Sequence, residues 1–265
     1  MGQIIEFPDI KKLKEKISEL KKTLGDFVIE RDNLVLVVCE NIKTAYMLEF
    51  GSLEYSLYES YCKYLRIRRK KEMIQAKKNR QEKIILSDIE LQLDREFVEY
   101  KKKLEKKISE INRALEHSKM ESLSDEDEAE IKKLYRGIVK KLHPDLNPKM
   151  TDVERELFYH AAQAYENGNL NAIRIIFQIV DNGDMDEDFP SSIKELRKEE
   201  ERLKTLVEQI QEEIDHIKTV PPYTLKKYVE DEKEKLEKIQ ELKQELLSFQ
   251  DAIMTEEEYI NELLQ

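Results

Sequence analysis

The most informative absences in this sequence concern cysteine, glycine, proline and tryptophan. Its 265 residues include 2 cysteines, 6 glycines, 6 prolines and no tryptophan. Cys39 and Cys62 are too few, and too far apart, for a zinc ribbon or a disulfide framework. A reducing cytoplasm is therefore the simplest compartment. The scarcity of glycine and proline favours long helices over a compact core of many strands.

Long apolar runs are also missing. The longest, Leu34 to Cys39, is far shorter than the roughly 20 residues that a helix needs to cross a bilayer. The first residues, MGQIIEFPDIKK, lack the apolar core of a signal peptide. The net charge of -11 disfavours general binding to nucleic acid. These features predict a soluble protein that does not contact membranes.

What the chain does contain is charge, because 39% of its residues are Asp, Glu, Lys or Arg. Together with abundant Leu and Ile, this composition predicts an elongated, all-α protein. Apolar residues at helical spacing predict a first helix that ends at Gly25 and a second over residues 27–49, before Gly51. Residues 34–38 could form a short buried strand, but helix is favoured because no turn residues or partner strand flank them.

Two longer helices are predicted next, over residues 52–82 and 87–117. Ser87 and Glu90 have the spacing of a capping box, which would start the second of these helices. Because the link between the two helices is short, we expect them to be antiparallel neighbours.

The middle of the chain carries two further capping signals. Ser124 with Asp127, and Thr151 with Glu154, predict the starts of two helices. Pro144 should end the first of them, because proline disfavours helical geometry in the residue before it. A shorter helix is expected to follow the second, before an acidic linker at residues 181–190.

The C-terminal part has the clearest heptad periodicity. One apolar stripe precedes Val220-Pro221-Pro222 and another follows it. Folding the chain back at the prolines would place Glu200, the charged position of the first stripe, opposite Lys243 of the second. This match predicts an intramolecular antiparallel coiled-coil hairpin.

Three consecutive domains follow from these patterns. We expect an N-terminal helical bundle with a long antiparallel hairpin over residues 1–119, a middle module over 120–182 and the coiled-coil hairpin over 191–265. Thr255 with Glu258 predicts a short last helix within the third domain.

The most specific signal lies in the middle module, where residues 131–148 read IKKLYRGIVKKLHPDLNP. A basic amphipathic helix precedes His143-Pro144-Asp145, and the next helix carries Phe158 and an Ala164-Tyr165 pair. This pattern resembles the J domain of DnaJ-like co-chaperones over about 60 residues, 120–182. The chain has no Gly/Phe-rich linker and no repeated Cys-x-x-Cys region, so it is similar to the specialised class of that family.

The resemblance implies that the module recruits a DnaK-type ATPase chaperone and promotes its ATP hydrolysis, while performing no chemistry and needing no cofactor itself. The helical arms would then bind a client or a scaffold protein. The residues that the resemblance assigns to the chaperone contact are His143, Pro144, Asp145, Asn147, Lys132, Tyr135, Arg136, Lys140, Lys141 and Phe158. A compact basic helix face suits an acidic partner surface.

The segment departs from the family pattern in two main ways. Gly137 lies inside the basic helix, where many family members carry a basic residue. The first helix of the family is not recognisable, and we expect residues 100–119 to take its place. In that arrangement the module would be rigidly continuous with the N-terminal hairpin.

Two features of the sequence bear on functions other than that of a co-chaperone. His143 and Asp145 lack a third ligand or a nucleophile at matching spacing, so the sequence predicts neither a metal site nor catalysis. The most basic stretch, which includes Arg66, Arg68, Arg69, Lys70 and Lys71, could meet phosphate groups of a nucleic acid. A solvated helix end is the favoured interpretation of that stretch. The alternative function is a coiled-coil adaptor or nucleic-acid-associated protein with a degenerate J module.

Overall fold

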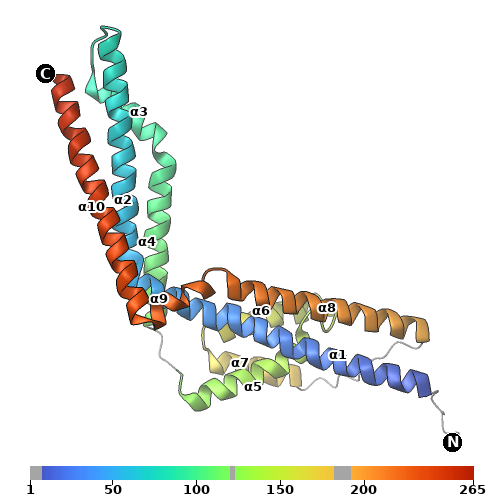
Figure 1. Ribbon diagram of the computed structural model, residues 1–265. Helices are drawn as coiled ribbons and strands as arrows, with labels where there is room; N and C mark the ends of the chain where they lie inside the picture. The colour runs from blue at the N-terminus through green and yellow to red at the C-terminus, as the bar shows by residue number, and fades with distance from the viewer. Residues whose placement is uncertain (1–7, 120–122, 182–191) are drawn as a thin grey trace, which may run out of the picture. The chain divides into compact units, whose positions relative to one another are not determined.

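The computed structural model describes residues 8–119, 123–181 and 192–265, and every regular element in these ranges is a helix (Figure 1). This confirms the all-α prediction. The helices form two compact units. The first unit contains α1 (Pro8–Asn33), the π-helical turn η1 (Leu34–Val38) and α5 to α8. The second contains α2 (Cys39–Asn79) from Ile42 onward, α3, α4, α9 and α10. The units are thus interleaved along the chain, unlike the three consecutive segments expected.

The first long feature is an uninterrupted helical path through α1, η1 and α2. The expected helix ends at Gly25 and Gly51 are therefore wrong, and so is the alternative of a strand at 34–38. Both glycines lie where a neighbouring side chain comes close. A Cβ atom built on Gly25 would lie 3.7 Å from Leu146 Cδ1, and one on Gly51 would lie 3.0 Å from Ile111 Cγ1.

In the first unit, α1 runs parallel to α8 (Ile193–Thr219) (Figure 1). Lys21 interacts electrostatically with Glu199, and farther along both helices Arg31 pairs with Glu213. Apolar residues of the two helices form a shared buried seam. Its members are Ile17, Leu24, Val28, Leu196, Leu203, Ile210 and Ile214. Such a pairing is typical of a short two-stranded coiled coil.

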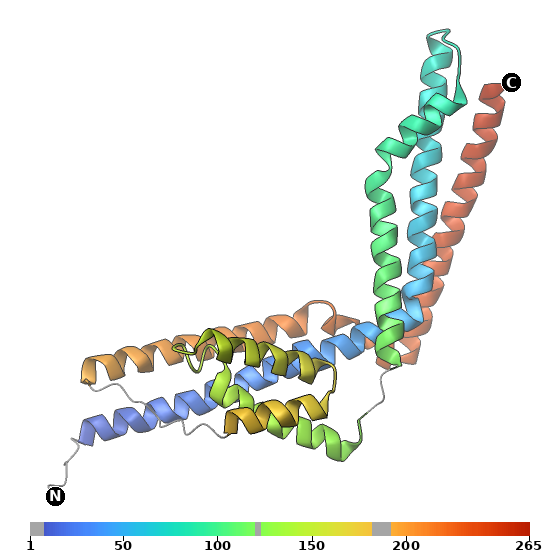
Figure 2. The ribbon, with the colours of Figure 1, turned by 180° about the vertical axis from the view of Figure 1, so that it is seen from behind.

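Three shorter helices of the same unit pack on one another and on this pair (Figure 2). They are α5 (Asp125–Leu142), α6 (Asp152–Glu166) and α7 (Leu170–Asp181). Both capping predictions for α5 and α6 are confirmed. The Ser124 side chain accepts a hydrogen bond from Asp127 N, and Thr151 with Glu154 forms a complete capping box. We call α5 to α7, with the loop between α5 and α6, the loop module.

In the second unit, α2 is antiparallel to α3 (Leu86–Glu96) and α4 (Val98–Ser118). Glu54 pairs with Lys107, and farther along α2 Arg66 pairs with Asp94. The predicted antiparallel hairpin is confirmed. The expected capping box at Ser87 is wrong, because α3 already starts at Leu86 and no side chain caps it.

The second unit is completed by α9 (Lys226–Glu230) and α10 (Glu232–Leu264). Here α10 is parallel to α2, since Glu49 pairs with Lys235 and Lys63 with Glu257. The helix runs through Thr255, whose hydroxyl donates to Asp251 O, so the separate last helix expected there is wrong.

The antiparallel C-terminal hairpin is also corrected, because the described residues 192–265 divide between the two units. The first arm, α8, pairs with α1, and the second arm, α10, packs with α2 and α3. Glu200 pairs with Lys204 on its own helix. A heptad seam indicates that a helix needs an apolar partner but does not say which one. The apolar stripe of α1, rather than that of α10, is the partner of α8.

Candidate functional site

The His143-Pro144-Asp145 loop follows directly on α5. His143 is the C-cap of the helix and its backbone N–H donates to Val139 O, while Pro144 prevents continuation, as predicted. Asn147 then satisfies the free end of the helix, because its side-chain amide donates to Lys140 O and Lys141 O. The loop is thereby fixed by hydrogen bonds to the helix that it ends.

The His143 ring is buried, with 5% of the residue exposed. It packs edge-on against the Phe158 ring at 5.1 Å. Asp145 N donates toward Nδ1 at 3.1 Å, and Arg31 Nη2 of α1 lies 3.2 Å from Nε2. A neutral imidazole has one accepting nitrogen, so only one of these two contacts can be a hydrogen bond at a time.

Burial lowers the pKa of His143, and the nearby Arg31 acts in the same direction. The carboxylates of Asp145 and Asp32 oppose this effect without reversing it. His143 is therefore neutral at physiological pH, which suits a ring that sits beside a guanidinium.

Two tyrosines join the loop module to the end of α1. The Tyr135 and Tyr165 rings stack at 4.2 Å with an interplanar angle of 2°. Tyr135 donates its hydroxyl hydrogen to Asp32 Oδ2 at 2.8 Å, and Tyr165 donates to Asn33 Oδ1 at 3.1 Å. Burial raises the pKa of both phenols, that of Tyr165 to about 12, and the Asp32 carboxylate adds to the effect. Both therefore remain hydrogen-bond donors.

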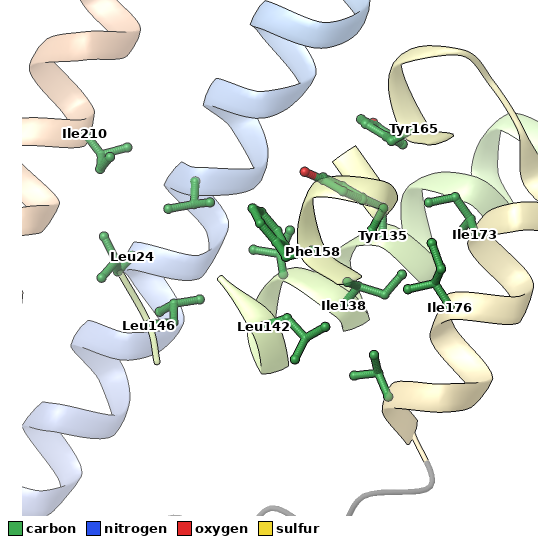
Figure 3. Packing of buried hydrophobic residues seen from close by; sticks show 14 of the residues in the cluster. Leu24, Tyr135, Ile138, Leu142, Leu146, Phe158, Tyr165, Ile173, Ile176 and Ile210 are labelled. Atoms are coloured by element: carbon green, nitrogen blue, oxygen red, sulfur yellow. The ribbon is translucent and has the colours of Figure 1, made fainter. Parts of the chain in front are cut away.

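These contacts change the expected roles of two residues. Tyr135 is 1% exposed and Phe158 is 9% exposed, so both belong to the core of the first unit in this conformation. Figure 3 shows them among the buried side chains of the module, with Leu146 beside α1. The resemblance had implied partner contacts for both, and neither presents its ring to solvent here.

The basic residues of α5 do share an exposed face, but most have partners within the chain. Lys132 pairs with Glu128 at 3.3 Å and Arg136 with Asp26 of α1 at 3.6 Å. Lys141 lies 3.0 Å from Asp181 Oδ1 and also donates to Val180 O, the end of α7. The Lys140 side chain is exposed, and its Cγ lies near the position of Gly25.

Asp145 lies at the edge of the loop with 33% of its side chain exposed. Its backbone carbonyl accepts a hydrogen bond from Arg202 Nη1 of α8 at 3.2 Å. Glu199 holds the Arg202 guanidinium through two hydrogen bonds of 2.8 and 2.7 Å. This arginine is thus directed at the loop by its own helix.

Sequence reasoning missed three residues of this site: Arg31, Asp32 and Arg202. The run Arg31-Asp32-Asn33 interrupts the apolar pattern of α1 just before the apolar η1, which was a usable signal for a buried polar contact. Arg202 carried no such signal. The prediction that residues 100–119 take the place of the first J helix is wrong. Residues 100–118 belong to α4 of the second unit, whereas α1 and η1 pack on α5 and α6.

The five residues named above from the basic stretch have carboxylate partners within the second unit. Arg66 pairs with Glu90 and Asp94, and Arg69 with Glu96. The remaining three of these five pair with Glu72 (Arg68), Glu90 (Lys70) and Glu256 (Lys71). Phosphate contacts would have to compete with these pairs, so the geometry does not favour the nucleic-acid alternative.

No known family model, curated protein or solved structure matches this chain. Within the described ranges, the side chains of His, Cys, Asp and Glu nowhere gather in a group of three that could hold a metal ion. In the same ranges, no helix combines the length and the apolar character that a membrane span requires.

Proposed function

We propose that this chain is a specialised J-domain co-chaperone that recruits a DnaK-type chaperone and stimulates its ATPase. The observation that carries the proposal is the antiparallel pairing of α5 and α6 with His143-Pro144-Asp145 at their junction. His143 faces Phe158 near the loop, and Tyr135 stacks on Tyr165 at the opposite end of the pair. A basic helix followed by this loop and an antiparallel partner helix is the arrangement that the sequence resemblance implies.

The chemistry of the face agrees with this role. Lys132, Lys133, Arg136 and Lys140 are exposed on α5 and would orient an acidic surface of the chaperone. Asp145, with part of its side chain exposed, is the loop residue best placed to contact a different, basic or polar group of the chaperone. The module would act by favouring one conformational state of the chaperone, without a reaction or a cofactor of its own. The helices of the second unit would supply the contact with a client or scaffold.

Single-turnover ATP hydrolysis by the DnaK-type chaperone of the same cell tests this proposal. We expect the wild-type chain to stimulate hydrolysis and Asp145→Asn to abolish most of the stimulation. His143→Gln should act in the same way. Because His143 is buried, its variant also needs a check of folding by circular dichroism, whereas the Asp145 side chain is partly exposed and its amide variant preserves the packing.

Equal stimulation by the wild type and Asp145→Asn would contradict the proposal. So would the absence of stimulation by every form of the chain, including the variants described in the next section.

A further inference from the structure

The face of the loop module that would receive the chaperone already has an occupant in this chain. Resting on the proposed function, we propose that the α1–α8 pair is an intramolecular competitor that covers this face, so that the chaperone binds only when the loop module separates from the pair. The proposal concerns the first unit alone, since α1, α8 and the loop module all belong to it.

Contacts from α1 reach both parts of the expected docking face. Asp26 pairs with Arg136 of the basic helix at 3.6 Å. In the last turn of α1, the Arg31 guanidinium lies 3.2 Å from the His143 ring. Next to Asp26, Gly25 brings the α1 backbone close to Leu146 of the loop and to Lys140. An acidic residue on α1 thus takes the position that an acidic partner surface would occupy.

The second helix of the pair, α8, also contacts the loop. Arg202 of α8 donates to the Asp145 carbonyl, and the Asp145 charge in turn raises the pKa of Arg202, after the larger effect of Glu199. His143 and Leu146 are both buried, because they lie between the other helices of the loop module and the α1–α8 pair. A chaperone could not engage the whole loop without displacing these groups.

The loop module and the α1–α8 pair share one cluster of buried apolar side chains, but the helices within each body contact one another more extensively than they contact the other body. α5, α6 and α7 pack mainly on one another, and α1 packs mainly on α8. The contacts between the module and the pair include many polar ones, among them Asp26–Arg136, Asp32–Tyr135 and Arg202–Asp145. Water can replace an exposed ion pair such as Asp26–Arg136 at a small net cost, whereas the buried Tyr135–Asp32 hydrogen bond costs more to break, so the separated form is the minor one. Separation of two intact bodies is still easier than removal of α1 alone.

A covered face lowers the apparent affinity for the chaperone, because that affinity is the intrinsic affinity multiplied by the fraction of molecules that is open. A covalent lock between α1 and the module tests this directly. A Cβ atom on Gly25 would lie 4.0 Å from Lys140 Cγ, so Gly25→Cys with Lys140→Cys places two thiols within reach of each other. Cys39 and Cys62 are buried and burial raises the pKa of each thiol, so they compete poorly for oxidation.

We expect the oxidised double variant to lose stimulation of the chaperone by at least about tenfold at sub-saturating concentration, and reduction to restore it. The Lys140→Cys single variant, treated with the same oxidant, controls for the loss of the lysine. If the locked and reduced forms stimulate equally, the proposal is overturned.

A complementary experiment loosens the cover. Asp26→Lys with Arg202→Glu should lower the concentration for half-maximal stimulation by about two- to fivefold, because it removes one exposed ion pair and one hydrogen bond to the loop carbonyl. Glu30→Lys is the matched control, because Glu30 of α1 pairs with Lys218 of α8 and not with the module. Hydrogen exchange of residues 139–147, measured without the chaperone, should quicken in the loosened variant only.

The outcomes separate this inference from the proposed function. Faster exchange without a change in stimulation, or stimulation that the lock does not affect, would overturn the cover and leave the co-chaperone function standing. Absence of stimulation in the wild type, the reduced double variant and the loosened variant would overturn the function itself. Stimulation by the loosened variant alone would support both.

Discussion

The two units are both built on parallel long helices, yet their interiors differ. The first unit has one continuous cluster of buried side chains that extends from the α1–α8 seam through all three helices of the loop module. The second has two smaller, separate clusters along α2, one with α3 and the end of α10 and the other with α9 and the start of α10. The three helices of the loop module, packed on the α1–α8 pair, therefore create a core in the first unit, whereas the described residues of the second unit form two narrower apolar seams.

The polar contacts of the two units also differ in how deeply they are buried. The buried polar residues, Asp32 and His143, both belong to the first unit, where each contacts Arg31. In the second unit the polar contacts include ion pairs at the helix surfaces, such as Arg66–Glu90 and Lys63–Glu257. Buried polar contacts define one geometry, while surface pairs contribute little energy each. The candidate site therefore lies in the unit that contains these buried polar contacts.

The largest difference should appear when the interiors are truncated. Ile138 is 0% exposed in the large cluster, and Ile253 is 5% exposed in a small one. We expect Ile138→Ala to destabilise the first unit by about 3–5 kcal/mol and Ile253→Ala to destabilise the second by about 2 kcal/mol, because a thin seam relaxes more easily around a cavity. Native-state hydrogen exchange resolves the two units separately. Equal effects would remove the distinction between core and seam.

A smaller difference should appear when glycines are filled. A Cβ on Gly137 would lie 2.4 Å from Phe177 Cε2, so Gly137→Ala forces α7 or its ring to move. We expect a net loss of about 1–2 kcal/mol, after the gain in helix propensity of about 1 kcal/mol. In the second unit, Gly51→Ala meets Ile111 at 3.0 Å and should be nearly neutral.

Gly25→Ala is the control for the glycine pair, because its neighbours lie at ordinary contact distance and the change should stabilise the first unit by up to about 1 kcal/mol. Chemical denaturation of each variant measures these changes. If Phe177→Leu does not relieve the cost of Gly137→Ala, the steric explanation fails.

The smallest difference concerns salt. Lys63 and Glu257 are about half exposed, so Lys63→Gln should cost the second unit no more than about 1 kcal/mol at low ionic strength. Raising the salt concentration to about 1 M should reduce this cost toward zero, since exposed charges are then screened. Hydrogen exchange of α2 and α10 at two salt concentrations gives the measurement. A cost that does not change with salt would indicate packing by the lysine stem instead.

The sequence predicted those parts of the fold that short segments encode. Ser124 and Thr151 cap their helices because the donor and the acceptor lie within four residues of each other. The expected helix ends at Gly25 and Gly51 were wrong for the opposite reason, since both glycines are buried inside helices beside residues that are distant in sequence, Leu146 and Ile111. The heptad stripe of α8 was correct as a stripe, but its partner was α1 and not α10.

The candidate site was predictable to the same extent. The loop and its basic helix are contiguous in sequence, so their residues could be named. The groups that surround them come from elsewhere, since Asp32 and Tyr135 are 103 positions apart and Arg31 and His143 are 112 positions apart. One sequence contains no information on such pairs. For the same reason the burial of Tyr135 and Phe158 could not be foreseen.

The parallel pairing of α1 with α8 also sets an order of events during synthesis. Arg31 and Glu213, which meet across the pair, are 182 positions apart. At the usual rate of about 5–20 residues per second, α5 to α7 leave the ribosome seconds before α8 does, and domains tend to form as they emerge. During that interval Arg202 is not yet present to meet Asp145. In a newly made chain, α1 is therefore the only helix of the pair that can contact the loop until α8 has emerged.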